Sequence, residues 1–198
     1  MKEKNNSSEK ETGFKRTSQK INSLGDDVDQ AIKEQIMANK TVYVETSIVS
    51  YLTARPSNNL IAAAWQKATN DWWDTQRNRF NLFASEIVLE EAGKGDPKAA
   101  KLRLTALEEI SLLEMTDSVL VFSKKLLNEG AVPSKAIDDS LHIALSVIHE
   151  VDYLLTWNFR HIDNAETKPI IRKICWDNGY QYPEICTPIE LMGNIKNG

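Results

Sequence analysis

The feature that most constrains the fold is a short apolar run at residues 41–44, TVYV, which ends at an acid and is followed directly by a helix-like segment. This run is β-branched and aromatic with almost no polar interruption, which is typical of a strand buried on both faces of a parallel sheet. Glu45 then lies at the carboxyl end of the strand, and Thr46 or Ser47 is suited to cap the next helix. Open α/β sheets bind ligands at this edge. Glu45 is therefore a candidate site residue, with a simple polar strand end as the alternative.

The rest of the chain alternates strand-like and helix-like segments, which predicts an α/β fold with a parallel sheet covered on both faces. Further strands are expected at Asn81–Ser85, Ile110–Glu114, Tyr153–Leu155 and Glu184–Cys186. Helices are expected at Asn59–Asn78, Glu86–Ala92, Lys98–Glu108, Ser118–Asn128, Ser134–His149 and Glu166–Gly179. Helical spacing places Leu60, Ala64, Ala68 and Trp72 on one inward face, and Ile137, Leu141, Ala144 and Leu145 on another.

The 198 residues fit one domain at 40–198, preceded by an extension at 1–39. Residues 1–25 are polar with few apolar side chains and predict a disordered tail. Residues 26–39 show helical spacing of apolar residues behind an acidic first turn and predict a short helix. Since Met37 lies just before the first strand, a start of the folded protein at Met37 is the alternative.

Composition limits the partners and the compartment. The net charge of −4 and pI of about 5.5 give no global basic field, so nucleic-acid contacts would need local patches. The two cysteines, Cys175 and Cys186, have no paired spacing, which favours reduced thiols in the cytoplasm. No apolar stretch is long enough to span a bilayer and the first residues are unlike a signal peptide, so we expect no membrane association.

Polar residues recur where the expected strands end or the next helices begin. They are Glu45, the pair Glu90 and Glu91, the pair Asp138 and Asp139, and Asn158. In a parallel sheet such residues converge on one edge, where gathered carboxylates would repel one another unless a divalent cation neutralised them. Oxygen ligands suit Mg²⁺ or Mn²⁺. Taken singly, each acid is better explained as a solvated surface residue or a helix-terminal acid, and only their joint placement favours a metal site.

Four segments in order, VYVETSIVSYL, SEIVLEEAGKGD, AIDDSLHIALS and YLLTWNFRHI, resemble the PIN-domain nucleases, specifically toxins of the VapC type. The resemblance covers residues 41–192. It implies a PIN-like three-layer α/β/α sandwich with a short central parallel sheet, and cleavage of RNA that depends on Mg²⁺ or Mn²⁺. It also implies a cognate antitoxin protein and a homodimer.

By the same resemblance, Glu45, Glu91 and Asp139 match the three acids that hold the metal, and Asn158 matches a fourth catalytic position. Two departures stand out. The first acid of the family is most often Asp, and Glu45 extends its carboxylate by about 1 Å. The fourth position is often acidic, whereas Asn158 is neutral, which puts a second metal in question.

Two histidines and a few basic residues complete the expected site. His142 lies one turn beyond Asp139 and is expected to be a packed, hydrogen-bonded histidine rather than a ligand, while the role of His161 is open. Candidate contacts to substrate are Thr46, Arg55, Lys94 and Arg160. The predicted function is that of a metal-dependent endoribonuclease toxin, and the alternative is a catalytically weakened module that binds nucleic acid or protein.

Overall fold

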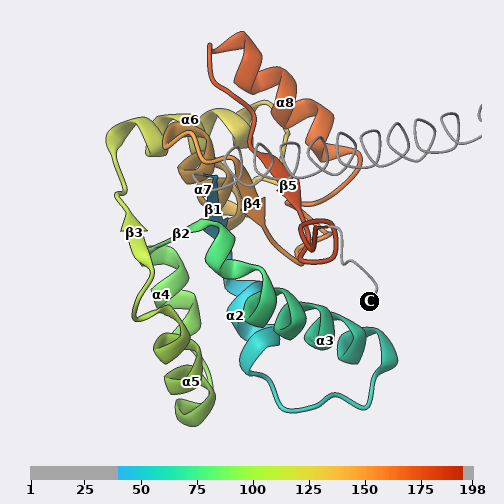
Figure 1. Cartoon of the computed structure of the whole chain (residues 1–198). Coiled ribbons are helices and arrows are strands. Elements are labelled where there is room, and N and C mark those ends of the chain that lie inside the picture. The colour runs from blue at the N-terminus through green and yellow to red at the C-terminus, as the bar shows by residue number, and fades with distance from the viewer. Residues whose placement is uncertain (1–39, 194–198) are drawn as a thin grey trace, which may run out of the picture. The chain divides into compact units, whose positions relative to one another are not determined.

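The computed structural model describes residues 40–193, in which five strands form one parallel sheet (Figure 1). The strands are β1 (Thr41–Val44), β2 (Asn81–Ser85), β3 (Ser111–Leu113), β4 (Tyr153–Leu155) and β5 (Glu184–Cys186). Their order is β3-β2-β1-β4-β5. The predictions for residues 1–39, including the helix at 26–39 and the start at Met37, lie outside the described residues.

Strand β1 lies at the centre of the sheet because its residues are apolar on both faces. Val42, Tyr43 and Val44 are fully buried, and Val42 pairs with Leu82 of β2 on one side and Tyr153 of β4 on the other. The chain runs outward from β1 through β2 to β3 and then returns to β4. The carboxyl ends of β1 and β4 therefore flank the topological switch point, where ligands bind in sheets of this kind.

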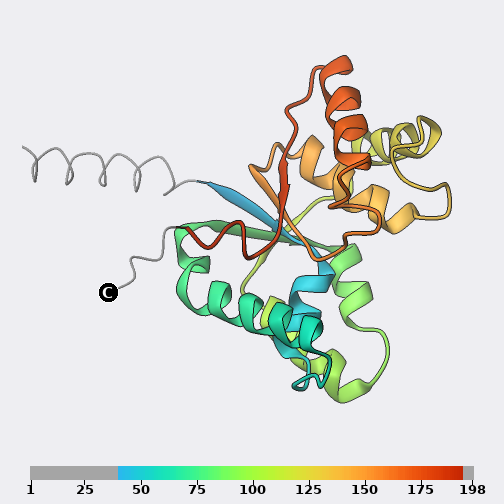
Figure 2. The same cartoon turned by 90° about the vertical axis from the view of Figure 1, so that its right-hand side faces the viewer.

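Helices cover both faces of the sheet, which confirms the predicted three-layer α/β/α fold. The views in Figures 1 and 2 place α2, α3, α4 and α5 on one face and α6, α7 and α8 on the other. Their bounds are α2 (Thr46–Thr53), α3 (Leu60–Thr75), α4 (Glu86–Ala92), α5 (Pro97–Leu107), α6 (Asp117–Asn128), α7 (Ile137–Ile148) and α8 (Thr167–Asp177), with a 3₁₀ turn at Arg77–Arg79. No helix within residues 40–193 is long and apolar enough to cross a membrane.

The predicted inward face of α3 is wrong at its start. Leu60 is 87% exposed, whereas Thr69, Trp72 and Trp73 are buried. The helix is rotated so that its large rings turn inward, and Trp65 stacks on Trp157 with ring centroids 5.3 Å apart. This packing gives the tryptophans a role in the core.

Two smaller predictions are also corrected. Ile137 is 54% exposed because it opens α7, and the buried face of that helix begins at Ser140. Neither Thr46 nor Ser47 caps α2. Glu45 is the N-cap residue, and its carboxylate accepts a hydrogen bond from the backbone N–H of Ser47.

Candidate metal centre

Glu45 is a buried acid at the point where β1 turns into α2, with 6% of its surface exposed. Its Oε1 accepts from the backbone N–H of Ser47 at 3.1 Å, and its Oε2 accepts from the hydroxyl of Ser47 and, at 2.7 Å, from that of Thr156. No lysine or arginine within residues 40–193 forms an ion pair with it. A buried carboxylate is normally paired with a basic residue or bound to a metal, and Glu45 has no basic partner among these residues.

Glu91 reaches the same place from α4. Its Oε2 accepts from the hydroxyl of Thr46 and lies 3.1 Å from Nε2 of His142. Burial acts to raise the pKa of the Glu91 carboxyl, but the hydrogen bonds with His142 and Thr46 outweigh it and hold the pKa below its usual value. The neighbouring Glu90 is exposed. Glu91, the second acid of the pair, is therefore the one whose side chain lies toward Glu45 and His142.

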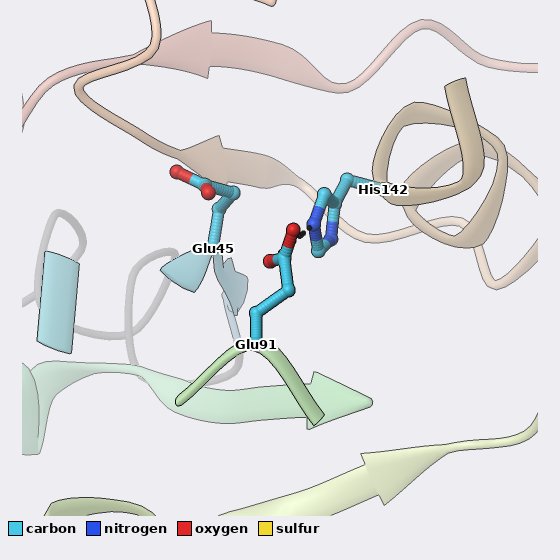
Figure 3. Close-up of side chains that lie close together, drawn as sticks. All are labelled: Glu45, Glu91 and His142. Carbon is cyan, nitrogen blue, oxygen red and sulfur yellow. Dashed lines mark hydrogen bonds and ion pairs between the residues drawn. The ribbon is translucent and has the colours of Figure 1, made fainter. Parts of the chain in front are cut away.

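Glu45, Glu91 and His142 each place one ligand-type atom in a group whose members lie within 4.8 Å of one another (Figure 3). Two carboxylates so close repel each other, and their oxygens are the ligands that Mg²⁺ and Mn²⁺ prefer. The two acids thus fit a divalent cation by donor type and separation, and neither pairs with a lysine or arginine within residues 40–193.

His142 is less available as a ligand than its position suggests. It is 1% exposed, and Nδ1 lies 2.8 Å from the hydroxyl of Tyr43 while Nε2 faces Glu91. Burial acts to lower the pKa of His142, but the hydrogen bond with Glu91 and the charges of Glu45, Glu91 and Asp139 raise it. This geometry agrees with the predicted packed and hydrogen-bonded histidine.

Asp139 lies in the first turn of α7 but outside the group that contains Glu45 and Glu91. Its Oδ1 accepts from Nδ2 of Asn158 at 2.7 Å, and its Oδ2 lies 2.6 Å from Nδ1 of His161. The backbone N–H of His161 in turn donates to Oδ1 of Asn158 at 3.1 Å. The predicted third acid and fourth polar residue are therefore in contact with each other, in a cluster that also includes His161.

The residues that hold Glu45 were not identified from the sequence. Thr156 comes directly after β4, as Glu45 comes directly after β1, and the two strands are neighbours in the sheet. Their positions at adjacent strand ends could have predicted the contact between Thr156 and Glu45. The hydroxyl of Thr156 also accepts the backbone N–H of Asn158 at 2.9 Å. Thr156 thereby links the first acid to the loop that carries the second cluster.

The four candidate substrate residues lie in different surroundings. Thr46 is engaged with Glu91, while Arg55, Lys94 and Arg160 are exposed. The charge of Lys94 contributes to the lowered pKa of Glu91, which places this lysine within electrostatic reach of the carboxylates.

No protein-family model matches the chain, and no curated protein matches it. Among solved structures, the chain is similar to one in the crystal structure of VapBC2 from Rickettsia felis bound to a DNA fragment from their promoter. That match has a TM-score of 0.49 and 12% sequence identity, and it covers 74% of this chain and 98% of the other. A likeness of this degree carries no inference about activity, so the function has to be judged from the side chains of the site.

Proposed function

We propose that this protein is a metal-dependent endoribonuclease that hydrolyses RNA phosphodiester bonds. The observation that carries the proposal is the convergence of the carboxylates of Glu45 and Glu91 at the switch point of the sheet, where neither has a lysine or arginine partner within residues 40–193. A site that gathers carboxylates without a lysine or arginine partner is suited to Mg²⁺ or Mn²⁺.

Each side chain has a defined part in this mechanism. Glu45 and Glu91 would hold the cation, and Asp139, which lies outside their group of ligand atoms, is proposed as the third acid. When bound, the cation supplies a water of lowered pKa and offsets the negative charge that develops at phosphorus. Ser47 and Thr156 orient Glu45 by hydrogen bonds from their hydroxyls.

The remaining polar residues serve the third acid and the substrate. Asn158 orients Asp139 through its amide. Lys94, Arg160 and Arg55 are proposed to contact phosphates of the RNA, an interaction that weakens with salt and carries little sequence information. Thr46 acts on the substrate only through Glu91, to which its hydroxyl donates.

We further propose that the nuclease is the toxin of a toxin–antitoxin pair, acts in the cytoplasm as a homodimer, and is inhibited by a cognate antitoxin protein. The support for this part is the resemblance of the four sequence segments to VapC-type PIN domains.

The full chain should be tested on a panel of structured and unstructured RNAs with Mg²⁺, Mn²⁺ or EDTA. Glu91→Gln and Asp139→Asn should each lower the cleavage rate roughly 100-fold or more, because a lost ligand removes several kcal/mol of transition-state stabilisation. Glu90→Gln and Asp138→Asn are matched controls, since each removes the same charge from an exposed neighbour. Cleavage that persists in EDTA, or that falls equally in the controls, would refute the proposal.

A second candidate is a binding module with the same fold and no catalysis. It is favoured by one observation, that both oxygens of Asp139 are engaged by Asn158 and His161 rather than turned to the other acids. RNA binding without cleavage by folded, metal-supplied protein would support this candidate.

A further inference from the structure

A chain of buried hydrogen bonds runs behind Glu91. The hydroxyls of Ser85 and Tyr43 are 2.6 Å apart, Tyr43 is 2.8 Å from Nδ1 of His142, and Nε2 of His142 is 3.1 Å from Oε2 of Glu91. Ser85 and Tyr43 are fully buried and His142 is 1% exposed. The chain joins β2, β1 and α7 to the acid on α4.

The protons of this chain can be assigned from what each group is able to donate. An ionised Glu91 only accepts, so Nε2 of His142 carries the proton between them. Tyr43 then either donates to Nδ1 of a neutral ring or accepts from Nδ1 of a charged one, and Ser85 supplies the complementary partner. In both arrangements Nε2 offers no lone pair toward the carboxylates.

The same geometry leaves Glu91 with one oxygen to offer. Oε2 takes the hydrogen bonds of both His142 and Thr46, and Oε1 has no hydrogen-bond partner within the described residues 40–193. Two contacts on one oxygen set the rotation of the carboxylate and keep the other oxygen available.

We propose that His142 is a positioning residue that orients Glu91 toward a divalent cation, and that Tyr43 and Ser85 hold its imidazole in place. It is not itself a ligand. This inference rests on the proposed function, because Glu91 is taken as a ligand there. Residues that orient a metal ligand in this manner change affinity roughly 10–100-fold when they are replaced.

The test uses the full chain and Mn²⁺. Calorimetric titration measures the affinity for Mn²⁺, and pulsed electron paramagnetic resonance detects nitrogen ligands of the bound ion. The wild-type spectrum should contain no ¹⁴N hyperfine coupling from His142. His142→Gln should weaken Mn²⁺ binding roughly 10–100-fold, and cleavage by this variant should recover at high Mn²⁺. A ¹⁴N coupling that disappears in His142→Gln would overturn the proposal, because it would identify His142 as a ligand.

Tyr43→Phe is the second variant, and it covers the case in which His142→Gln fails to fold. Tyr43 does not touch Glu91, so a weakening of Mn²⁺ binding by roughly 3- to 10-fold, the range for one lost hydrogen bond, would show action through His142. Tyr182→Phe is the matched control, since the Tyr182 hydroxyl is also buried but has no hydrogen-bond partner in the described structure. Unchanged Mn²⁺ affinity in Tyr43→Phe, or an equal loss in Tyr182→Phe, would overturn the proposal.

These outcomes separate the positioning role from the nuclease itself. Wild-type protein that binds Mn²⁺ with the expected dependence on Tyr43 and His142 but cleaves no RNA would refute the nuclease and support the positioning. Metal-dependent cleavage together with a ¹⁴N coupling from His142 would support the nuclease and refute the positioning role. Wild-type protein that binds no Mn²⁺ would overturn the positioning role.

Discussion

Thr156→Val is the sharpest test of how the site is held, because it removes one buried hydroxyl and changes little else. This hydroxyl donates to Glu45 at 2.7 Å and accepts from the backbone N–H of Asn158 at 2.9 Å. A hydrogen bond to a charged group contributes about 1.5–3 kcal/mol, and a buried N–H without a partner costs about 1–3 kcal/mol. Because Asn158 is only half-buried, water recovers part of the second cost. The expected loss is about 2–4 kcal/mol.

Urea unfolding at pH 7 with EDTA present measures this loss, with the slope checked for constancy between variants. Thr156→Ser is the matched control. It keeps the hydroxyl and loses a methyl group, and so should cost about 1 kcal/mol. A cost for Thr156→Val below about 0.5 kcal/mol, or an equal cost for the two variants, would show that the hydroxyl does not support the buried carboxylate.

Two further predictions concern the cation and pH. Mn²⁺ at about 100 times its dissociation constant should stabilise the folded state by about 2.7 kcal/mol. Calorimetry should show the resulting rise in Tm in wild type and in the control Glu90→Gln, but not in Glu45→Gln. Equal rises in all three proteins would exclude Glu45 as a ligand. Burial acts to raise the pKa of Asp152, but the hydrogen bonds from Lys40 and Thr41 outweigh it and lower the pKa in the folded state. The contribution of Asp152 to stability is therefore fully present above the unfolded pKa of about 3.9, and it is lost as the pH falls through the lower folded pKa. Asp152→Asn should therefore be about 1 kcal/mol less stable than wild type at pH 7, a value discounted because both ionic side chains reach solvent. In urea unfolding, this difference in stability should begin to narrow as the pH falls below about 4. A difference that stays constant from pH 7 to 3 would contradict this reasoning.

The strands were predictable because each is a short apolar run bounded by clear breaks. Residues 41–44, 81–85, 153–155 and 184–186 form strands with the predicted bounds, and only β3 is shorter, at 111–113 instead of 110–114. Short runs that are apolar on both faces are buried most completely in the middle layer of an α/β fold, where helices cover both sides of the sheet.

The rotation of the helices was less predictable, and α3 shows why. The predicted stripe of Leu60, Ala64, Ala68 and Trp72 is as regular as the stripe of Trp65, Thr69 and Trp72, and the two share Trp72. The choice between the stripes depends on the surface that each can bury. The aromatic neighbours of Trp65, which are Tyr51, Trp157 and Phe159, come from other parts of the chain. Periodicity on one helix contains no information about those neighbours.

The same limit applies to the candidate site. Asp139 and His142 lie three residues apart on one face of α7, so the spacing predicts that both approach the same edge of the sheet. The long imidazole reaches Glu91, while the short carboxylate meets the loop after β4. Which side chain meets which partner depends on the position of α7 against the sheet, and this position is a property of the packed molecule.

The three acids differ in their hydrogen-bond partners, but all three lack a lysine or arginine partner within residues 40–193. The partners of Glu45, Glu91 and Asp139 within residues 40–193 are hydroxyls, amides and imidazoles, and none of the three pairs with a lysine or arginine. Hydrogen bonds from such donors determine where each carboxylate points without placing a lysine or arginine beside it. If the acids served only stability, a basic partner or an apolar residue would cost less free energy. Under the proposed function, the chain would supply the orientation of the acids and a bound divalent cation would supply the compensating charge and the contact with a phosphate.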